Sequence, residues 1–138
     1  MTRLATPKDI PTLASRWYLE KAKTCFGGAQ VEWSIDLCAL SLYEAIVQSD
    51  HHLVIAERAG KIVAACAACL IRPIIPPHPL TVTEYMWWGD DRKATVRVWQ
   101  DCMDWGKQQG ATFAHYVLNQ RQSNPRKFTE TYQWRALV

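Results

Sequence analysis

One carboxylate, Glu84, lies within a stretch whose other residues indicate a β-strand. Residues 81–88 are mostly β-branched or aromatic, which suits a pleated, half-buried surface. Alternation along a strand places Glu84 on one face with Val82, Met86 and Trp88, so its carboxyl group would lie in a partly apolar cleft and have a raised pKa. Such a group can act as a general base. The sequence is equally compatible with a carboxylate that faces solvent at the edge of a sheet.

A short polar turn, residues 89–96, follows this strand and leads into a long amphipathic helix. The first turn of a helix has backbone N–H groups without partners and is therefore a ready binding site for anions. In this turn Arg92 and Lys93 could hold a phosphate group, and Thr95 could cap the helix. One interpretation of the turn is thus a compressed phosphate site.

The other interpretation is an ordinary polar turn. Asp90 and Asp91 stand where a polyanion would have to come, and carboxylates near a helix N-terminus are favoured by the helix dipole. Gly89 is the only glycine in the turn, although close approach of backbone to phosphate usually needs several. The ordinary turn is the favoured interpretation for this reason.

Other groups that could do chemistry do not cluster. Cys66 and Cys69 have the C-x-x-C spacing of metal and redox sites, but residues three apart on a strand point to opposite faces. The four histidines are dispersed along the chain. The sequence therefore predicts no metal site, and the two cysteines are expected to be buried small side chains.

The composition is that of one globular domain spanning residues 1–138. The net charge of +3 is too small to indicate nucleic acid as a partner. The spacing of the five cysteines suggests no disulfide framework, and the first residues, MTRLATPKD, form no signal sequence. We expect a soluble, cytoplasmic protein. The seven tryptophans exceed what a core of this size needs, which favours a ligand groove or a protein interface.

The periodicity of apolar residues predicts an alternating order of elements. We expect strands at residues 2–5, 51–58, 61–74, 81–88, 112–118 and 133–138, and helices at 6–23, 34–49, about 97–110 and 124–131. The order β-α-α-β-β-β-α-β-α-β predicts an α/β fold with a mixed central sheet and helices on both faces.

Several phrases of the sequence resemble the GNAT family of acetyl-CoA-dependent N-acetyltransferases. ATPKDIPTLA is similar to the opening strand and helix of that family, and VIAERAGKIVAACAA to its second and third strands. EYMWWG with the later DWGKQQGA resembles the fourth strand and third helix, notably in phage-encoded members, where a paired Trp recurs. Asn124 and the residues after it match a late helical region of the family.

The resemblance implies acetyl-CoA as cofactor and assigns roles to residues. Glu84 would be the base, acting through water, and the pantetheine arm would pair with the main chain of the strand end. The residues implied in cofactor binding are Met86, Trp87, Trp88, Gly89, Arg92, Lys93, Ala94 and Thr95. The tyrosine that protonates the thiolate falls on Phe128, which has no proton to donate, and Tyr132 could replace it only in another register. The turn is also shorter than the Gly-rich turn of the family.

Two functions remain after these departures. The first is a non-catalytic or degenerate homologue that works through contacts with other protein subunits or with itself, plausibly as a phage virion or internal virion component. The alternative is an active N-acetyltransferase that transfers an acetyl group from acetyl-CoA to an amine. The first predicts that Trp87, Trp88 and Phe128 fill the space between the strands ending at 88 and beginning at 112, and the second predicts an open cleft there.

Overall fold

The computed structural model describes the backbone of residues 1–21, 34–74, 76–121 and 128–137, and the side chains of 1–20, 34–74, 76–116 and 134–137. The strands are β1 (Thr2–Leu4), β2 (His51–Arg58), β3 (Lys61–Ile71), β4 (Thr81–Gly89), β5 (Phe113–Arg121) and β6 (Phe128–Ala136). The helices are α1 (Ile10–Lys21), α2 (Ile35–Val47) and α3 (Arg92–Gln108), and a 3-10 turn, η1 (Pro7–Asp9), precedes α1.

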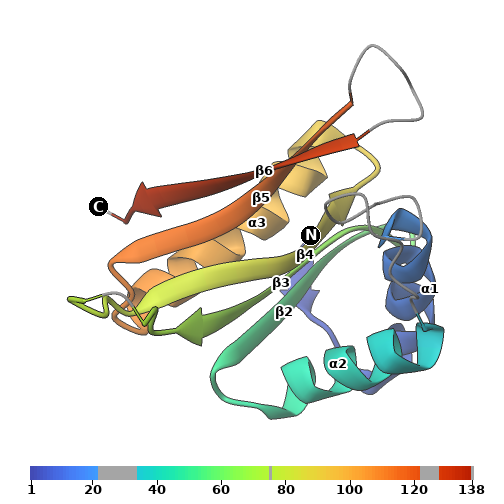
Figure 1. The fold of residues 1–138 in the computed structure, drawn as a ribbon. Coiled ribbons are helices and arrows are strands. Elements are labelled where there is room, and N and C mark those ends of the chain that lie inside the picture. The colour runs from blue at the N-terminus through green and yellow to red at the C-terminus, as the bar shows by residue number, and fades with distance from the viewer. Residues whose placement is uncertain (22–33, 75, 122–127, 138) are drawn as a thin grey trace.

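The six strands form one sheet in the order β1-β2-β3-β4-β5-β6 (Figure 1). All neighbouring pairs are antiparallel except β4 and β5, which are parallel. Helices α1 and α2 cover one face of the sheet and α3 covers the other. The predicted α/β class, with a mixed sheet and helices on both faces, is confirmed.

The sheet separates two apolar cores. Leu13 and Leu42, from α1 and α2, are fully buried against the face that carries Ile55 of β2. Val98 and Cys102 of α3 are fully buried against the opposite face. Both sides of β3 are therefore covered, which explains why its sequence is apolar at nearly every position.

The hairpin between β2 and β3 is built as the sequence indicates. Ala59 and Gly60 have φ values of 51° and 76°, the left-handed conformation that a two-residue hairpin turn requires. Gly110, with φ of 93°, follows the end of α3 as expected for a residue that closes a helix.

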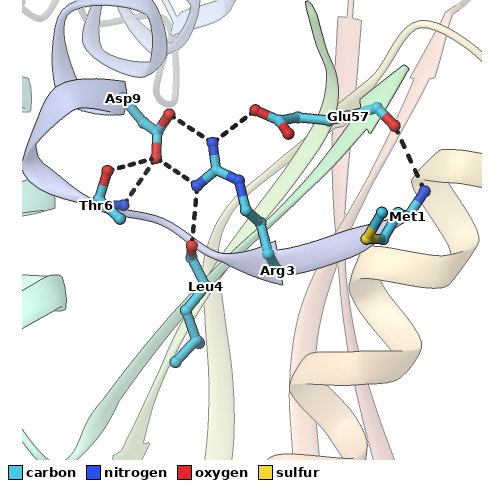
Figure 2. Close-up of polar contacts among 6 residues, drawn as sticks. All are labelled: Met1, Arg3, Leu4, Thr6, Asp9 and Glu57. Carbon is cyan, nitrogen blue, oxygen red and sulfur yellow. Dashed lines mark hydrogen bonds and ion pairs between the residues drawn. The ribbon is translucent and has the colours of Figure 1, made fainter. Parts of the chain in front are cut away.

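A polar network fixes the start of the chain to the sheet (Figure 2). The guanidinium of Arg3 donates to both carboxylate oxygens of Asp9, at 2.8 and 3.0 Å, and to Glu57 Oε1 at 2.6 Å. Asp9 also accepts from the backbone N–H of Thr6 at 2.8 Å. The Arg3 hydrogen bonds hold the pKa of the Asp9 carboxyl below its usual range. The network connects β1, η1 and β2 at the edge of the sheet.

The predicted late helix is wrong over residues 128–131, because these residues belong to β6. β6 pairs with β5 along its whole length, with Phe128 opposite Arg121 and Ala136 opposite Phe113. The alternating polar and larger residues of this segment satisfy the period of a strand, and pairing with β5 decides in favour of it. Residues 124–127 lie outside the described part of the chain.

Candidate functional site

The strands β4 and β5 pair over only three residues and then separate. Thr81, Val82 and Thr83 pair with residues 113–115, and no further pair follows although β4 continues to Gly89. The two strand ends diverge beside the N-terminus of α3 (Figure 1). The space between diverging parallel strands is the place where the main chain of β4 is free to pair with a ligand.

A β-bulge in β4 places Glu84 and Met86 on opposite faces of the sheet. Ala67 pairs with Met86, whereas the next residue of β3, Ala68, pairs with Glu84, so Tyr85 is an extra residue in β4. Cross-strand partners share a face of the sheet. Since Ala68 belongs to the α3 core and Ala67 to the α1–α2 core, Glu84 lies on the α3 side and Met86 on the other.

The predicted grouping of Glu84 with Val82, Met86 and Trp88 is therefore only partly correct. Val82 lies in the α3 core with Glu84, and Met86 and Trp88 lie in the core on the opposite face. The alternative of a solvent-facing carboxylate at a sheet edge is wrong, because Glu84 is 7% exposed and β4 is an inner strand.

Two thiols, those of Cys66 and Cys102, lie near Glu84. Cys102 of α3 donates to the backbone carbonyl of Cys66 at 3.5 Å. Burial raises the pKa of the Cys66 thiol, and the neighbouring Cys102 and Glu84 raise it further. Glu84 thus lies beneath α3 rather than at an open surface of the sheet.

Asp91 occupies the N-terminus of α3. It is the N-cap residue, and its Oδ1 accepts from the backbone N–H of Ala94 at 2.8 Å. Its other carboxylate oxygen forms an ion pair with Arg58 at 2.8 Å. The hydrogen bond from Ala94 and the pair with Arg58 lower the pKa of the Asp91 carboxyl, which is therefore ionised at neutral pH. A carboxylate of the chain itself thus holds the position at which the turn could bind an anion.

Thr95 lies in the first turns of α3, and the predicted cap at this position is wrong because the helix begins at Arg92. The Thr95 hydroxyl donates to the Asp91 carbonyl at 2.6 Å. A Cβ at Gly89 would lie 1.8 Å from the Thr95 Oγ1 atom, so only glycine fits at this end of β4. Gly89 therefore serves the close packing of strand on helix.

The two predicted cations of the turn differ in what surrounds them. Arg92 and Lys93 are both exposed. Lys93 lines a small pocket of about 120 Å³ together with Met1, Arg58 and Arg97, on the β1–β2 side of α3. Lys93 therefore lies across the helix from the diverging ends of β4 and β5. Asp90 pairs with Arg16 of α1 at 2.9 Å.

Aromatic side chains connect β4, α3 and β5 on the α3 face. The Trp87 Nε1 atom donates to the Thr95 carbonyl at 2.9 Å. The Trp87 ring stacks on Trp99 with centroids 5.9 Å apart, and Trp99 meets the edge of Tyr116 of β5 at 5.5 Å. On the other face, Trp88 is 7% exposed and the Arg16 guanidinium lies 4.4 Å from its ring centroid. Large side chains thus occupy both sides of the β4 end.

The two late aromatic residues lie on β6. Tyr132 is opposite Val117 of β5, and Phe128 is the first residue of the strand. They are therefore not one helical turn apart, as a helix there would have placed them. Their side chains lie outside the described part of the structure, so the catalytic role of Tyr132 and the filling of the space by Phe128 stay predictions.

Sequence reasoning missed the long-range partners of the turn. Arg16 of α1 pairs with Asp90, and Arg58 of β2 pairs with Asp91. No local sequence motif predicts such pairs. It also missed the hydrogen bond of 2.9 Å between His51 Nδ1 and the Tyr85 hydroxyl. Burial raises the pKa of Tyr85, so this hydroxyl keeps its proton at neutral pH.

The described ranges contain no group of three His, Cys, Asp or Glu side chains arranged to hold a metal ion. Cys66 lies in the α3 core and Cys69, three residues further along β3, points to the opposite face. Among the described helices, none combines the length and apolar character needed to cross a lipid bilayer.

Comparison with protein-family models and with curated proteins gives no match to this sequence. Solved structures do match. Ribosomal-protein-alanine N-acetyltransferase from Brucella melitensis superposes with a TM-score of 0.68 at 13% identity, covering 99% of this chain and 99% of that one. The acetyltransferase of GNAT family from Streptococcus pneumoniae gives 0.65 at 13% identity, covering 100% and 99%. A predicted acetyltransferase from Clostridium acetobutylicum, solved with acetyl-CoA, gives 0.65 at 12% identity, covering 86% and 80%. At these identities the likeness establishes the GNAT acetyltransferase fold.

Proposed function

We propose that this chain is a non-catalytic homologue with a GNAT fold, and that it acts through contacts with proteins. The observation that carries the proposal is the Asp91 carboxylate, which accepts the Ala94 N–H at 2.8 Å and pairs with Arg58 at 2.8 Å. A pyrophosphate at the N-terminus of α3 would have to displace this carboxylate from its hydrogen bond. The displaced carboxylate would then repel the phosphate.

The residues of the turn therefore do not fit a pyrophosphate group. Asp90 adds a second negative charge within the same turn, and Arg16 already pairs with it. Arg58, which contacts Asp91 at the helix N-terminus, is likewise engaged. The Trp87 ring, which stacks on Trp99 on the α3 face of the β4 end, supports the same proposal.

A stripe of apolar side chains on α2 supports protein contact. The α2 stripe consists of Leu37, Leu40, Tyr43 and Val47, which are 64%, 54%, 49% and 57% exposed. Their spacing of three and four residues places them on one side of the helix, opposite its buried side chains. A contiguous exposed apolar stripe of this kind marks an interaction surface.

Self-association through the α2 stripe can be tested by sedimentation velocity over a hundredfold range of protein concentration. We expect Leu40→Ser with Tyr43→Ser to convert a dimer to monomer, and Leu19→Ser, an equally exposed leucine on α1, to leave the dimer unchanged. If the wild-type protein is monomeric at every concentration, the α2 stripe does not mediate self-association, and its partner would be a different protein. The resemblance of the sequence to phage-encoded proteins suggests a virion as the setting, and co-purification with phage particles would test it.

Thermal unfolding with acetyl-CoA tests the non-catalytic part of the proposal. A ligand at one hundred times its Kd stabilises a protein by about 2.7 kcal/mol, a rise of several degrees in Tm for a chain of this size. We expect no rise for the wild type at millimolar acetyl-CoA. A rise that Arg92→Ala with Lys93→Ala abolishes, and that Lys8→Ala with Arg72→Ala preserves, would refute the proposal.

The alternative function is acetyl transfer from acetyl-CoA to an amine. The early separation of β4 from β5, after three pairs, is the observation that favours it. In that case the main chain of residues 86–89 would pair with the pantetheine arm, and Arg92 and Lys93 would bind the phosphates. Glu84 would accept the amine proton. The test is release of free CoA thiol from acetyl-CoA in the presence of a panel of primary amines. Release that Glu84→Gln removes would establish this function.

A further inference from the structure

A groove runs along the edge of the sheet between β1 and the exposed side of α3. Its volume is about 620 Å³, and its walls are the first two residues of the chain and the α3 side chains from Lys93 to Asp104. We call it the edge groove. It lies on the side of α3 opposite Trp87 and Trp99, and away from the α2 stripe. We propose that the edge groove binds an extended peptide segment of a partner protein, which adds as a strand to β1.

The outer edge of β1 presents backbone groups for such a strand. The Ala5 N–H donates to the Leu53 carbonyl and the Met1 carbonyl accepts from Glu57, both at 3.0 Å, and Arg3 pairs with Ile55 between them. In an antiparallel ladder alternate residues direct their N–H and C=O groups to the same side. Thr2 and Leu4 therefore direct theirs away from β2.

Both backbone groups of Thr2 are available for hydrogen bonds to an added strand, and Leu4 offers one. The Leu4 carbonyl accepts from the Arg3 guanidinium at 3.1 Å, which leaves the Leu4 N–H and both backbone groups of Thr2 for a ligand. In the described part of the chain, β1 is the terminal strand of the sheet. An added strand would pair with β1 through these three main-chain groups.

The Arg3 network holds this edge in place (Figure 2). Arg3 pairs across the sheet with Ile55 of the α1–α2 core, so its side chain reaches Asp9 on that face. Thr2 and Leu4 pair with Ala56 and Val54 of the α3 core, so their side chains lie on the face of the groove. A rigid edge strand lowers the entropic cost of binding a peptide.

The charges along the groove specify the peptide. Lys93 and Arg97 stand at the end where β1 begins, beside Met1. Asp101 and Asp104 stand at the other end, where Asp101 Oδ1 lies 2.8 Å from His52 Nε2 and Asp104 Oδ1 accepts from Gln100 at 2.9 Å, so the second oxygen of each carboxylate is left for a ligand. Within the described residues Lys93 and Arg97 have no ion-pair partner. Basic side chains near a helix N-terminus oppose the helix dipole, so their presence without a partner favours an anionic group from outside the chain.

The spacing of these charges sets the spacing in the ligand. The two pairs are separated by about 11 Å along the axis of α3, at about 1.5 Å per residue. An extended chain covers this distance in roughly four residues at about 3.3 Å each. Val96, which is 50% exposed, lies between the ends. The ligand therefore has an acidic side chain at one position, an apolar side chain two residues on, and a basic side chain two residues further, all on one face of the strand.

This inference rests on protein contact as the mode of action, but its test is independent of acetyl-CoA. The probe is a fluorescein-labelled peptide containing Lys-Thr-Val-Thr-Glu, which places the acid at the Lys93 end when it pairs antiparallel to β1. The measurement is fluorescence anisotropy at low ionic strength, where exposed charge pairs contribute most. We expect a Kd on the order of 10–1,000 µM, as for a short interface with few anchors.

Matched variants distinguish binding in the edge groove from attraction by the net charge of the protein. Lys93→Glu with Arg97→Glu should weaken binding by about tenfold or more, because both ligand contacts become repulsive. Lys8→Glu with Arg72→Glu changes the net charge equally at exposed sites outside the groove and should change the Kd by less than about twofold. The same peptide with an N-methylated valine keeps its charges, loses a main-chain donor, and should also bind about tenfold more weakly.

Three results would overturn the proposal. The first is no binding at 2 mM peptide, and the second is equal weakening by the two pairs of variants. The third is a dimer of the free protein that dissociates in Lys93→Glu with Arg97→Glu, which would make a second copy the occupant of the groove. None of these results depends on whether acetyl-CoA binds, so failure of the groove and failure of the proposed function remain distinguishable.

Discussion

Replacement of Gly106 by alanine should destabilise the fold, because α3 rests on β4 through this residue. A Cβ at Gly106 would lie 2.6 Å from the Val82 Cβ and 2.8 and 3.0 Å from its two Cγ atoms. These are distances that carbon atoms do not adopt in contact, and Val82 is fully buried in the middle of the sheet. The added methyl group must therefore push the helix from the strand.

The magnitude follows from two opposing effects. Overpacking of a rigid core site costs about 1–3 kcal/mol, and the upper part of this range applies because three atoms of one β-branched side chain are approached. Alanine in place of glycine within a helix contributes about 1 kcal/mol in the other direction. We expect a net loss of about 1–2 kcal/mol, which corresponds to a decrease in Tm of about 3–8 °C.

A double-mutant cycle with Val82→Ala tests whether contact with Val82 is the cause of the destabilisation by Gly106→Ala. Val82→Ala alone should cost about 2 kcal/mol through the cavity it leaves, and Gly106→Ala fills part of that cavity. In urea titrations the double variant should therefore be more stable than the sum of the single effects by about 1 kcal/mol or more. Additive effects, or a Gly106→Ala variant more stable than the wild type, would refute close packing at this contact.

Three further outcomes are expected. Trp87→Phe removes the indole hydrogen bond to a backbone carbonyl of α3 and should lower the free energy of unfolding by about 1 kcal/mol in urea titrations, and an unchanged midpoint would contradict it. The folded-state pKa of Asp9 is lowered, so unfolded chains bind more protons and stability falls as pH drops below about 4. In Asp9→Asn the free energy of unfolding should decrease less over this pH range. Equal pH dependence in the variant and the wild type would show that the Arg3–Asp9 pair does not contribute to stability. Alkylation followed by mass spectrometry should label Cys69 before Cys66 and Cys102, which are fully buried, and the reverse order would contradict their burial.

The order of most elements follows from local patterns. The hairpin at residues 59–60 is specified by its left-handed turn, and α3 by one apolar face closed with Gly110. The placement of Met86 and Trp88 on the face opposite Glu84 could not be predicted, because alternation along a strand fails at a bulge and the bulge exists only in relation to β3.

The state of the α3 N-terminus depended on residues far away in sequence. The sequence indicated that Asp90 and Asp91 suit a helix start, and the structure adds that Arg16 and Arg58 pair with them there. Local propensity also failed at β6, where Asn124 and Pro125 indicated a helix start but residues 128–131 pair with β5.

The most direct test of a capped, non-catalytic α3 terminus is an amide ¹H–¹⁵N spectrum of the protein titrated with acetyl-CoA to millimolar concentration. With the Asp91 carboxylate on the Ala94 N–H, the amide resonances of residues 91–95 should not move. Asp91→Ser, which keeps a capping side chain and removes the charge, should be the variant in which any response appears. Saturable shifts of the Ala94 and Thr95 amides in the wild type, with those of residues 86–89, would contradict the claim and make the chain a cofactor-binding acetyltransferase.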